Sequence, residues 1–232
     1  MTSKLRKILV VDDDPNIVRM IQRILELEGY EVITASDGQS ALQIFRKTAI
    51  SLVLLDIMMP GMDGVNVCNN IRQSSNIPII MVTAKGNVNE KLEGFAAGAD
   101  DYVTKPFPTK ELVARVNAVL RRLDFPDNFH KAPLFKFRNL EIDFEQKMVR
   151  INDKILDLTI TEYKLLAYMT NNPYRIISSE TILREVWGEE YKNDIHLLQV
   201  NIARLRQKLK EIDNNANYIE TKPSRGYLFN PN

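Results

Sequence analysis

Short apolar runs alternate with amphipathic stretches through the first half of the chain. Five runs rich in valine, isoleucine and leucine predict buried parallel strands, because such strands are covered on both faces. These runs are 7–11, 31–35, 52–56, 79–83 and 101–104. Helical spacing of apolar residues predicts helices over 15–28, 38–48, 64–73, 88–97 and 109–123. Strands that alternate with helices in this way predict a doubly wound α/β domain over residues 1–123.

The second half has a different pattern. Short runs at 134–137, 140–143, 148–151 and 155–158 predict antiparallel strands, with a turn at Asn152-Asp153 between the last two. Helices are expected over 161–171, 180–186 and 195–210, and two last strands over 218–220 and 227–229. Thr159 and Glu162 form a capping-box pattern ahead of the first helix. Strands, three helices and a terminal hairpin give the order of a winged helix, so we expect an α+β domain over 134–232.

The segment 124–133 holds two prolines and no periodicity, which predicts a linker between the two domains. A length of 232 residues fits two domains, and 44% hydrophobic with 26% charged residues is typical of globular proteins. No apolar run near the start is long enough for a signal peptide or a membrane span. The single cysteine, Cys68, cannot form an internal disulfide, so we expect a cytoplasmic protein without membrane contact.

The net charge gives no general sign of nucleic-acid binding. Residues 1–123 and residues 134–232 each carry 15 basic and 14 acidic side chains. A DNA-binding surface would therefore depend on local clustering of charge.

Polar residues follow four of the predicted strands of the first domain. Asp12-Asp13-Asp14 ends the first strand and Asp56 the third, while Thr83 ends the fourth and Lys105 follows the fifth. Carboxyl ends of parallel strands meet at one sheet edge, where clustered carboxylates need a cation such as Mg²⁺. The arrangement suggests Mg²⁺-assisted phosphoryl transfer to an aspartate, with Lys105 and Thr83 on phosphoryl oxygens.

Each of these residues also has a structural interpretation. Asp14 is better read as a helix cap, Thr83 alone could be a solvated strand end, and Lys105 alone could be a surface charge. The coincidence of polar residues at the ends of different strands favours a functional site.

The helix expected over 195–210 has an apolar stripe that should pack on the core of its domain. The stripe consists of Ile195, Leu198, Ile202, Leu205 and Leu209. The other side carries basic residues, as a helix in the DNA major groove does, and Arg204 could reach a base or a phosphate while Val200 could contact thymine methyl groups. An ordinary amphipathic surface helix is the alternative. The terminal turn adds Lys222 and Arg225, which could lie along phosphates or in a minor groove.

The first half resembles the receiver domains of bacterial response regulators. The resemblance rests on the runs Ile8-Leu-Val-Val-Asp-Asp-Asp14, Leu54-Leu-Asp56-Ile-Met-Met-Pro-Gly-Met-Asp-Gly64, Val82-Thr-Ala84 and Asp100-Asp-Tyr-Val-Thr-Lys-Pro-Phe107. It implies a flavodoxin-like sheet of strand order 2-1-3-4-5, with Asp56 as phosphoacceptor. Asp13 and Asp56 would bind Mg²⁺ with the main-chain carbonyl of Met58, with Asp12 nearby or acting through water. Tyr102 would be the switch aromatic.

The second half resembles the winged-helix effector domain of the OmpR/PhoB subfamily. The matching runs are Asp157-Leu-Thr-Ile-Thr-Glu-Tyr-Lys-Leu-Leu166, Val186-Trp-Gly188, Val200-Asn-Ile-Ala-Arg-Leu-Arg-Gln-Lys-Leu209 and Gly226-Tyr-Leu-Phe229. Together with the helix pattern, it marks the following residues as expected DNA contacts: Val200, Asn201, Arg204, Arg206, Gln207, Lys208, Lys222 and Arg225. This chain has His196, Gln199 and Asn201 where members often have Arg, Asp and His, and Pro223 replaces the usual wing arginine.

The resemblance implies a phosphorylation-switched transcription regulator. A sensor histidine kinase would phosphorylate Asp56, and a homodimer would form through the face of the fourth helix, fifth strand and fifth helix. The charged residues expected on this face are Lys91, Asp100, Asp101, Glu111, Arg115 and Arg122. Ala96 and Asn117 stand where members often place a further ion pair, which would weaken the face. The dimer would bind tandem half-sites in double-stranded DNA, and RNA polymerase is a further partner that the resemblance allows.

No enzymatic activity is expected beyond Mg²⁺-dependent self-phosphorylation and dephosphorylation of Asp56. Two other classes of protein remain open at this point. One is a constitutive DNA-binding protein whose first domain is a fixed dimerisation module. The other is a metal-dependent phosphatase, although phosphatases with an aspartate nucleophile usually have a second Asp where this chain has Met58.

Overall fold

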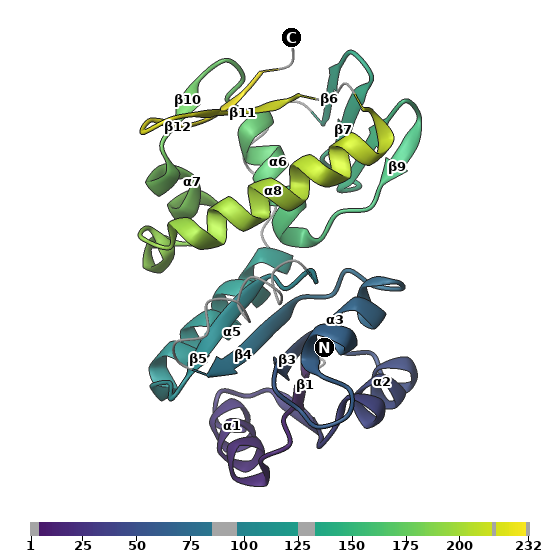
Figure 1. Ribbon diagram of the computed structural model, residues 1–232, viewed down its shortest axis with the longest axis vertical. Coiled ribbons are helices and arrows are strands. Elements are labelled where there is room, and N and C mark those ends of the chain that lie inside the picture. Colours follow the sequence, from purple (N-terminus) through teal and green to yellow (C-terminus); the bar gives the residue numbers. More distant parts are fainter. Residues whose placement is uncertain (1–4, 85–96, 125–132, 215–216, 231–232) are drawn as a thin grey trace. The chain divides into compact units, whose positions relative to one another are not determined.

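The computed structural model describes residues 5–84, 97–124, 133–214 and 217–230 (Figure 1). The chain forms two compact units, of which the first ends at Arg121 and the second begins at Arg122. In the described ranges, no helix combines the length and the apolar character needed to cross a lipid bilayer.

The first unit is built on a parallel sheet. Its strands are β1 (Lys7–Val11), β2 (Glu31–Ala35), β3 (Leu52–Asp56), β4 (Ile79–Ala84) and β5 (Asp101–Lys105). They pair in the order β2-β1-β3-β4-β5, which confirms the predicted order. Every residue of β3 is buried, since it is the central strand and is covered on both faces.

Helices connect these strands. They are α1 (Pro15–Leu27), α2 (Gly38–Lys47), α3 (Gly64–Arg72) and α5 (Thr109–Asp124). Asp14 caps α1, as predicted, because its carboxylate accepts a hydrogen bond of 2.8 Å from the Asn16 amide. Asp37 and Asp63 cap α2 and α3 in the same way. The helix predicted over 88–97 lies outside the described residues, apart from Ala97 in a turn.

The second unit begins with an antiparallel sheet of β6 (Leu134–Phe137), β7 (Leu140–Asp143), β8 (Met148–Ile151) and β9 (Lys154–Leu156). Asn152 and Asp153 have φ angles of 50° and 62°, which confirms the turn predicted between β8 and β9. The last strand ends two residues earlier than predicted, because the chain leaves the sheet to reach Thr159, the N-cap of the next helix.

Helices and a terminal hairpin complete the second unit and confirm the winged-helix order. The helices are α6 (Ile160–Thr170), α7 (Ser179–Val186), the short 3₁₀ turn η1 (Glu189–Tyr191) and α8 (Ile195–Ile212). Strands β10 (Ile176–Ile177), β11 (Ile219–Lys222) and β12 (Gly226–Phe229) form the second sheet in the order β10-β12-β11. The sequence did not predict β10, since two residues are too short to show a period.

Gly226 allows the hairpin to pack against β10. Its φ angle is 118°, and a Cβ atom there would lie 2.0 Å from the carbonyl oxygen of Ile177. Only glycine combines this backbone conformation with so close an approach of two main chains.

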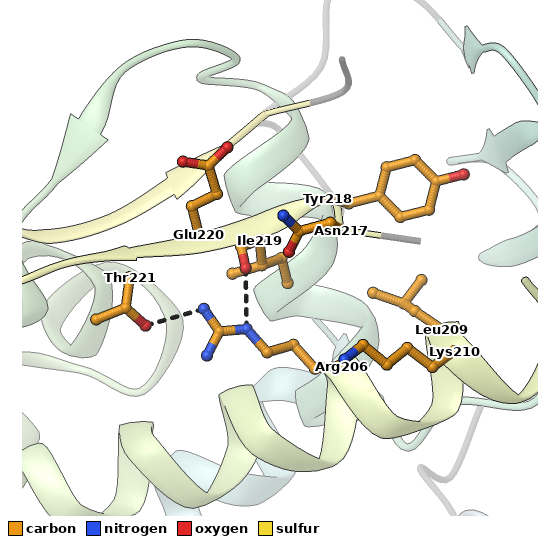
Figure 2. A pocket seen from close by; sticks show the side chains of 8 residues that line it. All are labelled: Arg206, Leu209, Lys210, Asn217, Tyr218, Ile219, Glu220 and Thr221. Carbon is orange, nitrogen blue, oxygen red and sulfur yellow. Dashed lines mark hydrogen bonds between the residues drawn. The ribbon is translucent and has the colours of Figure 1, made fainter. Parts of the chain in front are cut away.

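Arg206 of α8 forms hydrogen bonds to the β11–β12 hairpin (Figure 2). Its Nε donates a hydrogen bond of 2.9 Å to the carbonyl oxygen of Ile219, and Nη2 donates one of 2.9 Å to Thr221 Oγ1. The guanidinium also lies 6.0 Å from the ring centre of Tyr227. Arg206 lines a cavity of about 390 Å³ between α8 and β11.

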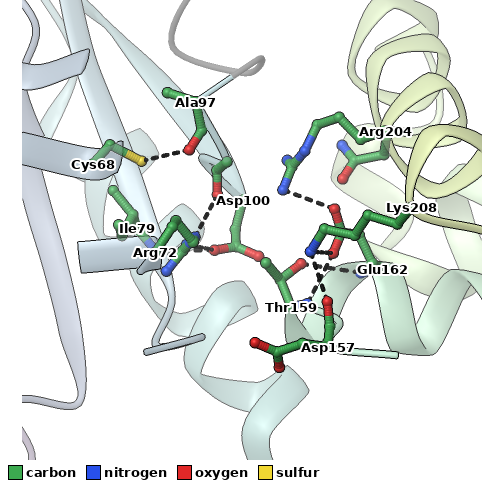
Figure 3. A network of polar contacts seen from close by, with 12 residues as sticks. Cys68, Arg72, Ile79, Ala97, Asp100, Asp157, Thr159, Glu162, Arg204 and Lys208 are labelled. Atoms are coloured by element: carbon green, nitrogen blue, oxygen red, sulfur yellow. Dashed lines mark hydrogen bonds and ion pairs between the residues drawn. The ribbon is translucent and has the colours of Figure 1, made fainter. Parts of the chain in front are cut away.

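A buried ion pair fixes one end of the sheet in the first unit. Arg72, at the end of α3, donates from Nη2 to Asp100 Oδ2 at 2.9 Å, and the Ile79 amide donates to the same oxygen at 3.0 Å (Figure 3). Arg72 also donates to the carbonyl oxygens of Ser75, Ile77 and Gly98. These contacts join α3, the start of β4 and the approach to β5.

A second buried carboxylate, Glu162, joins α6 to α8 within the second unit. Arg204 Nη2 lies 2.9 Å from Glu162 Oε1, and Lys208 Nζ lies 2.8 Å from Oε2 (Figure 3). Glu162 also completes the predicted capping box: it accepts a 2.9 Å hydrogen bond from the Thr159 amide, and its own amide donates to Thr159 Oγ1 at 3.3 Å. The Glu162 side chain is 0% exposed.

The surroundings of Glu162 keep its carboxylate charged. Burial raises the pKa of the Glu162 carboxyl, but Arg204, Lys208 and the hydrogen bonds lower it by more, so the pKa lies below its ordinary value of 4.5. Because the folded-state pKa is depressed, this contribution to stability is present above pH 4.5 and is lost as the pH falls through the folded-state value.

We therefore predict that Glu162→Gln destabilises the second unit by about 3 kcal/mol at pH 7, since it leaves two cations without their buried counter-charge. Glutamine can still form a capping box, so the comparison isolates the charge. Fluorescence of Trp187, the only tryptophan of the chain, reports urea unfolding of this unit. The difference in unfolding free energy between the wild type and Glu162→Gln should decrease as the pH falls below 4.5. Equal stabilities of the two proteins at pH 7 would contradict the prediction.

Candidate functional site

Three carboxylates gather at the carboxyl edge of the parallel sheet. Asp12 and Asp13 follow β1 and Asp56 ends β3, the neighbouring strand. One carboxylate oxygen from each lies within 4.8 Å of the others. Asp12 and Asp56 are buried and Asp13 is exposed. The predicted convergence of strand ends on one acidic cluster is therefore present in the structure.

Lys105, the last residue of β5, lies between two of these carboxylates. Its Nζ is 2.7 Å from Asp12 Oδ2 and 3.1 Å from Asp56 Oδ1. Burial lowers the pKa of Lys105, but Asp12 and Asp56 raise it by more, so it lies above its ordinary value of 10.5. The ammonium group is therefore charged at neutral pH and offsets part of the repulsion between the carboxylates.

Burial raises the pKa of the Asp56 carboxyl to about 6, against an ordinary value of 3.8. Lys105 acts in the opposite direction, while the charges of Asp12 and Asp13 raise the pKa further. A carboxylate in this position is poorly solvated and surrounded by like charge, which are the conditions in which a cation binds strongly.

The donor set fits Mg²⁺. This ion prefers carboxylate oxygens from one or two residues and keeps several of its waters. Asp12 already accepts hydrogen bonds from the Asp14 amide and from Lys105, whereas the exposed Asp13 opens the cluster to solvent. Asp13 and Asp56 would hold the ion, with Asp12 beside them. Met58 lies two residues after Asp56; ligation by its main-chain carbonyl remains a prediction.

The main chain around Asp56 is closely packed. A Cβ atom at Gly64, the first residue of α3, would lie 2.0 Å from the carbonyl oxygen of Asp56. The Gly64 amide donates a 3.0 Å hydrogen bond to the carbonyl oxygen of Ile57. The start of α3 therefore holds the loop after β3 against the acidic cluster, and only glycine leaves room for this approach.

Thr83 and Tyr102 lie on neighbouring strands beside the cluster. Asp56 pairs with Val82 in the sheet register, so Thr83 stands one residue further toward the carboxyl edge. Thr83 is buried. Tyr102 on β5 is half-buried, and the Arg115 guanidinium lies 5.3 Å from the centre of its ring. The expected roles of Thr83 and Tyr102 in switching remain predictions.

Several charges expected on the dimer face are buried in the structure. Asp100 pairs with Arg72 in its own unit, and Asp101 pairs with Arg115 Nη1 at 2.9 Å. Both carboxylates are therefore engaged inside the unit, and their expected place on a dimer face remains a prediction. Glu111 is half-buried and lies 3.2 Å from Arg115 Nε.

Arg122 is buried as well. The boundary between the two units falls inside α5, so Arg122 belongs to the second unit, where its guanidinium lies 5.4 Å and 5.7 Å from the ring centres of Tyr191 and Trp187. Lys91 lies outside the described residues. Asn117, at a position where the subfamily often has a charge, accepts a 2.6 Å hydrogen bond from the Tyr30 hydroxyl.

Two expectations for α8 are wrong. Ile195 was assigned to the packed stripe, but it is 50% exposed at the first turn of the helix, and Leu197 is buried instead. Asn201 was assigned to DNA, but it is 0% exposed and its Nδ2 donates a 2.8 Å hydrogen bond to the Leu197 carbonyl oxygen. The packed face of α8 is therefore rotated toward Leu197 and Asn201.

The other residues expected to contact DNA differ in their contacts and in their exposure. Arg204, Lys208 and Arg206 contact Glu162 or the hairpin, as described above. Lys222 lies 2.6 Å from Glu220 Oε2. Of the remaining residues, Val200 is half-buried, and Gln207 and Arg225 are exposed.

Sequence reasoning missed the second role of Glu162. It read Glu162 as a helix cap and Arg204 and Lys208 as DNA ligands. One signal was available, because Arg204 and Lys208 are four residues apart and so lie on the same side of a helix, where one carboxylate can bind both.

Comparison with known proteins identifies both halves of the chain. Residues 8–117 match the response regulator receiver domain, and residues 153–229 match the family described as transcriptional regulatory protein, C terminal. Across almost the whole length, the chain is 45% identical to the probable transcriptional regulator ycf27 of Galdieria sulphuraria, over 96% of this chain and 89% of that protein. It is 38% identical to the transcriptional regulatory protein SrrA of Staphylococcus aureus, over 96% and 95% of the two chains.

A solved structure agrees with these matches. The response regulator DrrB of Thermotoga maritima, an OmpR/PhoB homologue, superposes with a TM-score of 0.52 at 31% identity, over 98% of this chain and 100% of that one. The order of the parallel strands, the winged-helix order of the second unit and the full-length relatives all lead to the same assignment: the chain belongs to the OmpR/PhoB-type two-component response regulators, transcription regulators that join a receiver domain to a C-terminal DNA-binding domain.

Proposed function

We propose that this regulator is switched by transfer of a phosphoryl group from a sensor histidine kinase to Asp56. The observation that carries the proposal is the position of Lys105, whose ammonium lies within 3.1 Å of both Asp12 and Asp56 at the mouth of an acidic cluster. A carboxylate and an ammonium so arranged can accept a phosphoryl group and neutralise one of its oxygens.

In this reaction an oxygen of the Asp56 carboxylate attacks phosphorus, and the bond from phosphorus to the histidine nitrogen of the kinase breaks. The electron pair of that bond stays on the histidine, and an aspartyl phosphate forms. Mg²⁺ held by Asp13 and Asp56 would supply positive charge to the phosphoryl oxygens. Lys105 holds a second oxygen of the group. Hydrolysis by water later restores the Asp56 carboxylate and releases inorganic phosphate.

A small phosphodonor, acetyl phosphate, serves for tests of this proposal without the kinase.

The phosphoryl group would then bias the domain toward an active conformation. Thr83 would donate a hydrogen bond to it, and Tyr102 on the neighbouring strand would turn inward. This shift would favour a homodimer through β5, α5 and the segment 88–97, and the two effector domains would bind tandem half-sites in double-stranded DNA. RNA polymerase is a further proposed partner, and the cytoplasm the proposed compartment.

We expect Asp56→Asn to accept no phosphate, because an amide nitrogen or oxygen cannot replace the nucleophilic carboxylate. The measurement is the mass of the intact protein after incubation with acetyl phosphate and Mg²⁺. Asp14→Asn is the matched control, since Asp14 directly follows Asp12 and Asp13 in the sequence but only caps α1. This variant should be labelled like the wild type. Full labelling of Asp56→Asn would exclude the assigned site.

Mg²⁺ should stabilise the first unit, because it binds the folded carboxylate cluster and not the unfolded chain. At a concentration 100 times the dissociation constant, the gain is about 2.7 kcal/mol. Calorimetry of the full chain with and without the ion measures it. Asp13→Asn should reduce the gain strongly and Asp14→Asn should leave it unchanged. An equal gain in Asp13→Asn would place the ion elsewhere.

Phosphorylation should also convert a monomer into a dimer that binds tandem-site DNA more tightly. Analytical ultracentrifugation and a DNA mobility assay measure the two effects with and without acetyl phosphate. Arg225→Ala should weaken DNA binding, with a salt dependence smaller by about one phosphate contact, and should leave dimerisation unchanged. If dimerisation and DNA binding are the same with and without acetyl phosphate, a constitutive DNA-binding protein is favoured instead.

A further inference from the structure

The cations of α8 are largely engaged inside the second unit. Arg204 and Lys208 both contact the buried carboxylate of Glu162, at 2.9 Å and 2.8 Å (Figure 3). Lys208 also donates to the carbonyl oxygen of Asp157 at 2.9 Å. Arg206 is turned to β11 and binds Ile219 and Thr221 (Figure 2). Three of the four basic residues of this helix therefore have contacts that hold their charged ends.

The solvent-facing side of α8 has a different composition. Gln199, Ala203 and Gln207 are exposed and follow one another at four-residue spacing. Val200, which is half-buried, lies beside them. At about 100° per residue, these four positions fall within about 100° of arc and form one stripe along the helix. We call these four residues the carboxamide stripe. The exposed Lys210 borders it at the last turn.

The side chains of the carboxamide stripe suit one kind of base pair. A glutamine can make two hydrogen bonds to N7 and N6 of adenine, and methyl groups of alanine or valine contact the methyl group of thymine. Guanine is usually read by arginine or lysine, and the arginines of α8 are held by Glu162 and β11. The hydrogen bond from Gln207 to Glu211 is 3.3 Å long and exposed, so a base edge can replace it.

We propose that Gln199 and Gln207 each read an A·T base pair in the DNA major groove, with Ala203 and Val200 against thymine methyl groups between them. This inference rests on the proposed DNA-binding function and adds the chemistry of the sequence that is recognised. Gln199 and Gln207 are eight residues apart, which corresponds to about 12 Å along the helix. Base pairs are stacked 3.4 Å apart, so the two A·T positions lie no more than about four base pairs apart in one half-site.

Selection of bound duplexes from a random DNA pool by the full-length phosphorylated protein tests this proposal. The wild type should enrich half-sites in which two positions prefer A·T by at least about fivefold. Gln199→Ala and Gln207→Ala should each remove the preference at one of these positions and leave the other intact. Gln207→Arg should convert its position to a preference for guanine. Alanine is a good helix former, so the exposed substitutions keep α8 folded.

Two controls separate base reading from general effects. Gln146→Ala changes an exposed glutamine in the turn between β7 and β8 and should leave the selected sequence and the affinity unchanged. Arg225→Ala should weaken binding to all sequences alike. Two results would overturn the proposal while DNA binding stands. One is a selected half-site with no two positions that prefer A·T, and the other is a base preference that is unchanged in both Gln199→Ala and Gln207→Ala. If no DNA is retained in any round, the proposed DNA-binding function fails, and the base assignment fails with it.

Discussion

The ammonium of Lys105 is the contact on which the receiver site depends. Parallel strands bring Asp12, Asp13 and Asp56 to one sheet edge, where three negative charges repel one another in a partly buried space. Lys105 supplies one positive charge within 3.1 Å of two of them. Three carboxylates and one ammonium leave two negative charges when all are ionised. A divalent cation would balance them, so Lys105 and the proposed Mg²⁺ would complement each other at this site.

The same problem has a different solution in the second unit. Glu162 is fully buried, but two cations from α8 bind its two oxygens, so its negative charge needs no cation from outside. Its cluster is closed, whereas the open cluster around Asp56 has the exposed Asp13 on its solvent side. The closed cluster around Glu162 joins two helices, and the open cluster around Asp56 leaves a place for a ligand. Burial of charge thus serves packing in one unit and chemistry in the other.

The sequence predicts the receiver site well because the site follows from topology alone. Residues at the ends of parallel strands must share an edge, so Asp12, Asp56 and Lys105 could be placed together without any knowledge of side-chain contacts. The effector helix is harder to predict. Its period shows that α8 is amphipathic, but Asn201 and Ile195 lie at the borders of the apolar stripe, and a small rotation of the helix exchanges one for the other.

The partners of the basic residues could not be predicted either. Whether Arg204 faces a phosphate or a carboxylate depends on where α6 packs, and Glu162 is distant from it in sequence. Asp100 shows the same limit, since its charge looked available for a dimer until α3 brought Arg72 to within 2.9 Å. Hydrophobic periodicity places an element in the fold, whereas ion pairs between elements depend on the packing that follows.

The position of Glu162 at the first turn of α6 has a mechanical consequence. The side chain that completes the capping box of this helix also forms ion pairs with Arg204 and Lys208 of α8. A displacement of α8 would therefore also displace the beginning of α6 through these short ionic contacts, in addition to the apolar packing between the two helices. The N-terminus of α6 is in this way coupled directly to the position of α8.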